Sequence, residues 1–190
     1  MSEKDKELWQ KIEKKACRSL KKSSEDETNK TKMTKNKSKV IDFDRVKDCY
    51  MINIKKNFKI DNDPRSIDAI FDTEDGRMVF VEFKNGKLSP KNVLEKLYDS
   101  VLINNDLLGI SIGKLRKDGI FILVYNPGSL EKIKGTIERK SKKKLKRMQI
   151  GKFKGYIFKE VYSLTKDQFE DWIEKNGVYF PNLYKNNFSK

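Results

Sequence analysis

The chain contains no histidine, and this absence excludes several kinds of catalytic and metal site. Serine and cysteine hydrolases rely on an imidazole base, so neither class is expected. Only two cysteines are present, Cys17 and Cys49, which are too few for a disulfide framework, and without histidine a conventional zinc cluster is excluded too. Any chemistry must come from carboxylates, lysine, tyrosine, the backbone or a metal ion held by oxygen atoms.

Long apolar runs are also missing. No stretch approaches the roughly 18 residues of a membrane span, and the polar, lysine-rich start does not resemble a secretory signal. We therefore expect no membrane contact and a cytoplasmic location. The 190 residues, 36% hydrophobic and 37% charged, suffice for one medium domain with appendages.

The positive charge is concentrated in two regions of the chain. With 43 Lys+Arg and 28 Asp+Glu the net charge is +15, of which residues 1–40 carry +6 and residues 132–159 carry +11. Residues 1–40, rich in Lys, Ser, Thr and Asn, are expected to form a basic and largely flexible segment. The second region favours binding of a polyanion, most simply DNA or RNA, because its like charges repel with little compensation. Its candidate nucleic-acid-binding residues are Lys140, Lys142, Lys143, Lys144, Lys146 and Arg147.

The order of predicted elements indicates an α/β or α+β fold, with a central mixed sheet flanked by helices and a C-terminal β-α addition. We expect a single domain over residues 41–190. Its parts are a core over about 42–127, a basic helical segment over about 130–150, and a C-terminal strand and helix over about 153–176. The predicted elements are a helix capped by Asp42 through about Met51, strands over 52–60, 66–72, 77–84, 119–125 and 153–162, and helices over 89–105 and 165–176.

Two charges interrupt the apolar strand predicted over 77–84. Glu82 and Lys84 are two residues apart, so alternation puts both on one face of the strand. Charged groups in an apolar run must be paired, bind a metal ion or lie at an open edge. This strand therefore carries the candidate site.

The loop before this strand decides whether another acid joins the two charges. A three-residue loop over 74–76, a type I turn followed by glycine in the left-handed conformation, pairs Thr73 with Arg77 and places Asp68 opposite Glu82. A loop one residue shorter puts the two acids on opposite faces. We favour the three-residue loop because it gathers the embedded charges in one place.

Two carboxylates side by side repel each other unless a cation lies between them. Mg²⁺ is the natural cation for oxygen ligands that leave room for several waters, with Mn²⁺ as the alternative. A lysine on the same face can act on the attacking water or on a substrate phosphate. A divalent cation, a water and a lysine are sufficient for phosphodiester hydrolysis, so these residues favour a Mg²⁺-dependent nuclease.

Asp68, followed fourteen residues later by Glu82-Phe83-Lys84, resembles the motif of the PD-(D/E)xK nuclease superfamily. The resemblance covers about residues 42–127 and implies a restriction-endonuclease-like core: a helix, a three-strand hairpin sheet, a second helix and a further strand. It also implies that Asp68 and Glu82 bind the metal ion with the Phe83 carbonyl, and that Lys84 positions or activates the attacking water. In this chain Ile67 stands where the motif usually has proline.

The resemblance implies further site residues, among which the sequence leaves the choice open. The superfamily often has an acid on its first core helix, and the candidates here are Asp42, Asp44 and Asp48. The helix after the motif often adds polar side chains, and the candidates are Lys91, Lys96 and Tyr98. Independently of the resemblance, Asp72 shares a face with Asp68 and is an alternative metal ligand.

Two other interpretations fit the same residues. Glu82 and Lys84 would form an ordinary surface row on an edge strand, but this leaves Met78 and Phe80 on the same exposed face. Alternatively, the fold is a non-catalytic module that binds nucleic acid or, as an inhibitor or immunity-type protein, another protein. The expected partner of the nuclease is DNA or RNA, and a homodimer is left open.

Overall fold

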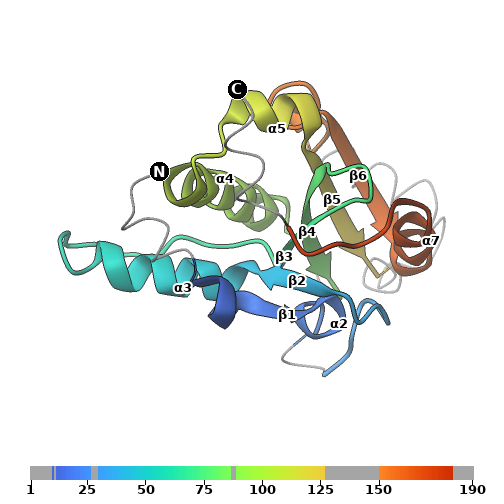
Figure 1. Ribbon diagram of the computed structural model, residues 1–190, viewed down its shortest axis with the longest axis horizontal. Helices are drawn as coiled ribbons and strands as arrows, with labels where there is room; N and C mark the ends of the chain where they lie inside the picture. The colour runs from blue at the N-terminus through green and yellow to red at the C-terminus, as the bar shows by residue number, and fades with distance from the viewer. Residues whose placement is uncertain (1–9, 11, 27–29, 87–88, 127–149, 182–190) are drawn as a thin grey trace.

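The computed structural model describes residues 10, 12–26, 30–86, 89–126 and 150–181, and within them a six-stranded mixed sheet forms the centre of an α+β fold (Figure 1). Its strands lie side by side in chain order. They are β1 (Cys17–Ser19), β2 (Lys39–Asp42), β3 (Ala69–Asp72), β4 (Met78–Lys84), β5 (Ile120–Tyr125) and β6 (Glu160–Thr165). Pairing is antiparallel from β1 to β4 and parallel from β4 to β6, so β4 has an antiparallel neighbour on one side and a parallel neighbour on the other.

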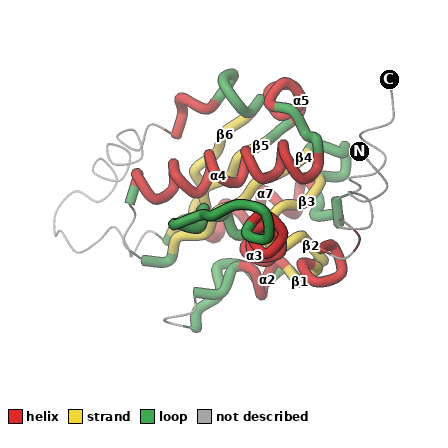
Figure 2. The backbone as a smooth tube through the Cα atoms, turned by 90° about the vertical axis from the view of Figure 1, so that its left-hand side faces the viewer, coloured by secondary structure: helices red, strands yellow, loops and turns green. Residues whose placement is uncertain are grey.

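Helices cover both faces of the sheet. One face packs against α3 (Phe43–Ile54), α4 (Pro90–Leu108) and α5 (Ile112–Asp118), and Figure 2 shows α4 running across the strands. The other face packs against α2 (Leu20–Ser23) and α7 (Lys166–Asn176). Alternation along β4 sends Phe80 to the first core and Val81 to the second. Burial on both sides explains the unbroken apolar sequence of β5, and the predicted internal strand is confirmed.

The β3–β4 hairpin has the predicted register. Thr73 N–H donates to the Arg77 carbonyl at 2.9 Å, and Gly76 adopts φ +77° at the end of the three-residue loop. The strand pairs include Ala69 with Val81. Gly76 provides the left-handed conformation that this loop requires, and the strands continue the register towards Asp68.

The helix starts follow from capping residues. Asp42, Ser89 and Thr165 each accept a backbone N–H from the first turn of α3, α4 and α7. Thr165 and Gln168 form the predicted capping box. These three predicted helices are confirmed, with α3 and α4 each ending three residues later than expected.

The N-terminal part of the chain is more ordered than we expected for residues 1–40. Residues 12–16 are helical, β1 and α2 follow, and Ile12, Ala16 and Leu20 are buried. Over 12–26 and 30–40 the structure therefore differs from the expected flexible segment, and the domain begins before residue 41. Apolar residues spaced by four supply the buried contacts, and β1 pairs along the edge of β2.

Other predicted elements also differ from the structure. The strand expected over 52–60 is absent from these described residues, because α3 continues to Ile54 and turns follow. The strand expected over 153–162 is replaced by a 3₁₀ turn, Ile150–Phe153, and β6 begins only at Glu160. Two strands, not three, lie between α3 and α4, since β2 precedes α3. The basic helical segment lies largely outside the described residues.

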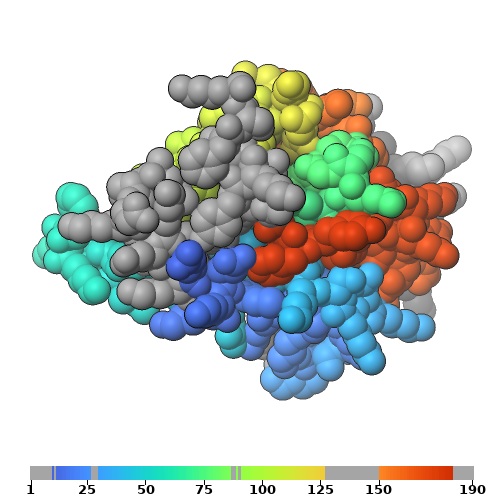
Figure 3. Space-filling view, in the orientation of Figure 1, coloured from blue at the N-terminus to red at the C-terminus, as the bar shows by residue number. Residues whose placement is uncertain are grey.

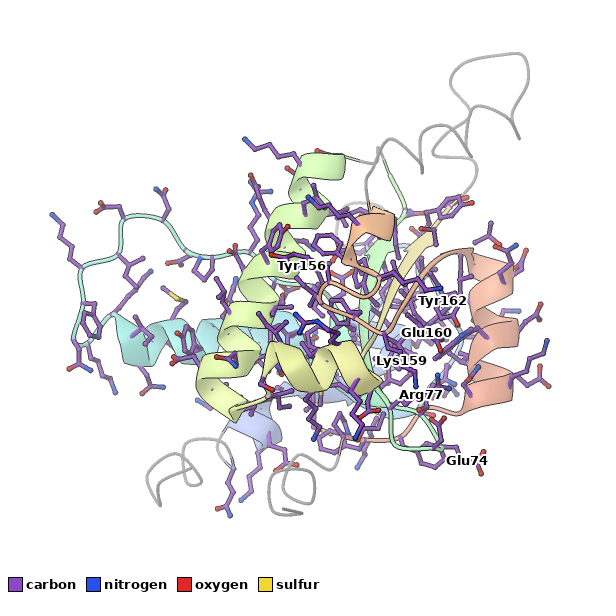
Figure 4. All side chains as sticks on the ribbon, turned by 90° about the horizontal axis from the view of Figure 1, so that it is seen from above. Glu74, Arg77, Tyr156, Lys159, Glu160 and Tyr162 are labelled. Carbon is purple, nitrogen blue, oxygen red and sulfur yellow. The ribbon has the colours of Figure 1, made fainter. Side chains whose placement is uncertain are left out.

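The turn of the hairpin is tied to β6 and to the chain that follows α7. Arg77 Nη1 lies 3.3 Å from Glu160 Oε1, and the Tyr162 hydroxyl also bonds Glu160 (Figure 4). Asp72 N–H donates to the Tyr179 carbonyl at 2.9 Å. In the space-filling view the red segment after α7 accordingly lies between the green hairpin and the blue N-terminal part (Figure 3). Among the described helices, none combines the length and the apolar character that crossing a membrane requires.

Candidate functional site

Asp68 lies at the entrance to β3 and is held by β4 and by the first residue of α3. Its backbone N–H donates to the Val81 carbonyl at 3.1 Å, and its carbonyl accepts from Phe43 N–H at 3.1 Å. The Phe83 N–H donates to Asp68 Oδ2 at 2.5 Å. The predicted strand pair of Asp68 with Glu82 is not among the pairs of this hairpin, which end at Ala69 with Val81. Asp68 nevertheless lies beside the strand that carries Glu82.

Glu82 and Lys84 project from β4 on the face that α3 and α4 cover. The Glu82 side chain is fully buried, and Lys84 Nζ lies 2.6 Å from Glu82 Oε1. On the backbone between them, the Phe83 N–H points towards Asp68, whereas the Lys84 carbonyl accepts from Asn126 N–H on the other side. Because the N–H and C=O of one strand residue point the same way, the Phe83 carbonyl is directed to the side of Asp68.

Lys96 of α4 brings the two acids together. Its Nζ lies 3.2 Å from Asp68 Oδ1 and 2.9 and 3.0 Å from the two oxygens of Glu82. The Lys96 side chain is 21% exposed. One ammonium thus contacts both carboxylates that were predicted to share a cation, and Lys96 is the helix candidate that the structure brings to the site.

Burial and mutual repulsion shift the protonation of this cluster. Burial, and then the charge of Glu82, raise the pKa of Asp68 to about 7, although Lys96 and the Phe83 N–H act in the opposite direction. Burial disfavours the charge on Lys96, but the attraction of Asp68 and Glu82 outweighs it and raises the pKa of Lys96. Lys96 therefore stays protonated at neutral pH, and the pKa of Asp68 lies close to neutral pH.

The cluster opens into a cavity of about 480 Å³. Asp68, Lys84 and Lys96 line it from the sheet and α4. The opposite wall comes from the N-terminal part of the chain, which contributes Arg18, Lys22 and Lys30 together with the acids Glu25 and Asp26; none of these residues was predicted from the sequence. No signal in the sequence indicated them, because residues 1–40 were expected to form a flexible segment.

Two buried serines hold the segment that leads to Asp68. The Ser100 hydroxyl of α4 accepts from Ile67 N–H at 2.9 Å, and the Ser66 hydroxyl bonds the carboxylate of Asp44. Both serines are at most 2% exposed. Neither serine was predicted from the sequence, since the partner of each lies more than twenty residues away along the chain.

The candidate acids of the first core helix are now distinguishable. Asp42 and Asp44 line the cavity, whereas Asp48 is 65% exposed and pairs with Lys47. Asp42 caps α3 and lies 3.2 Å from Arg18. Asp44 is therefore the helix acid that faces the cavity without serving as the cap.

The remaining candidates lie away from the cluster. Asp72 is four residues beyond Asp68 along the strand, about 13 Å at the usual rise per residue, and its backbone pairs with Tyr179. Tyr98 packs against Phe153 with ring centroids 5.2 Å apart. Lys91 is 84% exposed. The basic residues 140–147 lie outside the described residues.

The donor set fits a hard divalent cation held by few protein ligands. In the part of the chain that the structure describes, no three side chains of His, Cys, Asp or Glu gather closely enough to hold a metal ion. Asp68 and Glu82 nevertheless converge on one cationic atom, and the Phe83 carbonyl is directed to the same side. Mg²⁺ commonly binds through one or two carboxylates and retains several waters, so these oxygens match its requirements.

Comparisons with known proteins add no family to this geometry. A scan against protein-family models finds no match, and searches of curated proteins and of solved structures find none either.

Proposed function

We propose that the chain is a Mg²⁺-dependent nuclease that hydrolyses phosphodiester bonds in DNA or RNA, on a core resembling the PD-(D/E)xK superfamily. One observation carries the proposal. The partly buried Asp68 and the fully buried Glu82 both contact the Lys96 ammonium beside Lys84. Asp68, Lys84 and Lys96 line a cavity that opens to solvent, and Glu82 lies directly behind them. A carboxylate of perturbed protonation in a cavity, as Asp68 is here, is typical of functional sites.

The order of elements around the site supports the resemblance in its central part. A helix precedes the β3–β4 hairpin, and α4 then leads to β5, which lies parallel to β4. Asp68 at the entrance of β3 and the Glu82-Phe83-Lys84 motif at the end of β4 are compatible with the resemblance. The position of β2 before α3 is a departure from the expected three-strand hairpin.

Each residue of the site has a defined task in the proposed reaction. Asp68, Glu82 and the Phe83 carbonyl would hold Mg²⁺, which when bound supplies Lewis-acid stabilisation of the developing phosphate charge. The ammonium of Lys84 would orient the attacking water and balance negative charge on the phosphate. Arg18 and Lys22, on the opposite wall of the cavity, would attract the backbone of the nucleic acid.

A cleavage assay on pooled DNA and RNA tests the proposal. Wild type should cleave with Mg²⁺ or Mn²⁺ and not with EDTA, and Glu82→Gln should abolish cleavage while circular dichroism stays unchanged. Glu95→Gln is the matched control, because Glu95 lies on α4 and its side chain is 37% exposed. Cleavage in EDTA, or undiminished cleavage by Glu82→Gln, would contradict the proposed chemistry.

A non-catalytic binding module is the second candidate, and the ion pairs favour it. Lys84 and Lys96 already balance Glu82 and Asp68 without any further cation. Such a module should bind nucleic acid or a protein partner with Glu82→Gln as well as wild type does. It should lose a nucleic-acid partner when Lys142, Lys143, Lys144 and Lys146 are neutralised, which a salt-dependent binding assay would measure.

A further inference from the structure

Lys96 takes the position at which a divalent cation would bind. An ammonium carries three N–H donors, and three carboxylate oxygens lie within 3.2 Å of Lys96 Nζ: Asp68 Oδ1 and both oxygens of Glu82. Lys84 is placed differently, because its Nζ is 2.6 Å from Glu82 Oε1 and it extends from the strand itself. Removal of Lys84 therefore leaves the two acids bridged, whereas removal of Lys96 leaves the partly buried Asp68 and the buried Glu82 without a cation between them.

A divalent cation held by both acids would need the position between them that the Lys96 ammonium occupies. Mg²⁺ needs carboxylate oxygens at about 2.0–2.1 Å, and the Lys96 ammonium already lies against the oxygens concerned. The Lys96 side chain lines the cavity and has a flexible four-carbon stem, so it can withdraw from the acids. In the cavity its charge would face lining residues that include the acids Glu25, Asp26 and Asp44, and any bound phosphate.

We propose that Lys96 is a built-in competitor of the divalent cation: its ammonium bridges Asp68 and Glu82 while the site is free and leaves them when the cation binds. The inference rests on the proposed function, since it concerns the same two acids, but it is a statement about cation binding and not about cleavage. Its consequence is that wild type binds divalent cations more weakly than the two carboxylates alone would.

Isothermal titration of the full chain with Mn²⁺ alone tests the competition. Lys96→Met keeps the length and apolar stem of the side chain and removes its charge, and it should bind Mn²⁺ about tenfold more tightly or better, given the size of a charge–charge interaction at such distances. Lys96→Arg keeps the charge and should stay close to wild type or bind more weakly. Lys91→Met, on the same helix and 84% exposed, is the matched control and should equal wild type.

Thermal unfolding supplies a second readout, because Lys96→Met leaves buried carboxylates without their ammonium. Its midpoint in EDTA should fall below that of wild type, and Mn²⁺ should raise it by more than it raises wild type. Folding of Lys96→Met in Mn²⁺ but not in EDTA would also support the exchange of cations. If Lys96→Met folds in neither condition, the two cations are not interchangeable and the inference is overturned.

The results separate this inference from the nuclease proposal. Unchanged or weaker Mn²⁺ binding by Lys96→Met overturns the competition even if wild type cleaves nucleic acid. Tighter binding supports the competition even if wild type cleaves nothing, in which case the nuclease proposal alone fails. Absence of Mn²⁺ binding by both proteins overturns the competition and the proposed metal site together.

Discussion

The Ser100 hydroxyl accepts a hydrogen bond of 2.9 Å from the backbone N–H of Ile67, the residue before Asp68. Through this bond α4 fixes the approach of the chain to β3. Lys96 lies about one turn before Ser100 on the same face of α4, and its ammonium contacts the Asp68 carboxylate. One helix therefore sets both the backbone and the charge environment of Asp68.

Ser100→Ala should lower both stability and site function. The buried Ile67 N–H would lose its acceptor, which costs about 1–3 kcal/mol of the free energy of unfolding, and urea unfolding measures it. Displacement of Asp68 should also weaken Mn²⁺ binding. Ser111→Ala is the control, because Ser111 caps α5 by accepting from Lys114 N–H. Loss of this cap should lower the free energy of unfolding by about 1 kcal/mol without changing Mn²⁺ affinity. Equal Mn²⁺ affinity in both variants would show that Ser100 does not position Asp68.

The stability of the metal-free protein should depend on the protonation of Asp68. Burial and Glu82 raise the pKa of Asp68 in the folded protein to about 7, above its value of about 4 in an unfolded chain. The folded state therefore binds the proton more tightly, and the contribution of this group is present below pH 4 and is lost as the pH rises through 7. Urea unfolding in EDTA should show this decline in wild type, and Asp68→Asn should reduce it.

Asp48→Asn is the control for this pH dependence, since Asp48 is 65% exposed and lies outside the cavity. Its profile should follow that of wild type. An Asp68→Asn profile with the same slope as wild type would refute the assignment of the decline to Asp68.

Lys84→Met should separate catalysis from cation binding. Both carboxylates keep their contacts with Lys96, so Mn²⁺ affinity should remain within a few-fold of wild type. The proposed loss of the group that orients the water should reduce cleavage by about 10²–10⁴-fold, measured under single-turnover conditions. Lys91→Met should cleave like wild type, and retained cleavage by Lys84→Met would exclude the role assigned to Lys84.

The N-terminal part of the chain should prove integral to the domain. Leu20 is fully buried against the second core, so Leu20→Ala should cost about 2–5 kcal/mol, measured by urea unfolding. Lys37→Ala, at an exposed position of the same region, should change stability by at most about 0.5 kcal/mol. A Leu20→Ala protein as stable as wild type would mean that residues 12–26 do not belong to the folded unit.

Local chemistry in the sequence determined the hairpin and several helix ends. The turn over 74–76 and the alternation along β4 set the register from Asp72 to Ala69 and bring Asp68 beside the strand that carries Glu82, because a left-handed glycine and a period of two act over a few residues. The capping box at Thr165 likewise predicts the start of α7. These features were predictable since every interaction that defines them lies within a short stretch of chain.

Tertiary packing alone decided which distant residues complete the site. Lys96, Lys91 and Tyr98 were equivalent helix candidates, and only the placement of α4 against β3 and β4 directs Lys96 to the acids. The position of Arg18 in the cavity likewise depends on how the N-terminal part packs, because Arg18 lies on β1, which pairs with β2. Such contacts join residues many positions apart, and their geometry is set by the packing of whole elements around two cores, which no local pattern of the sequence encodes.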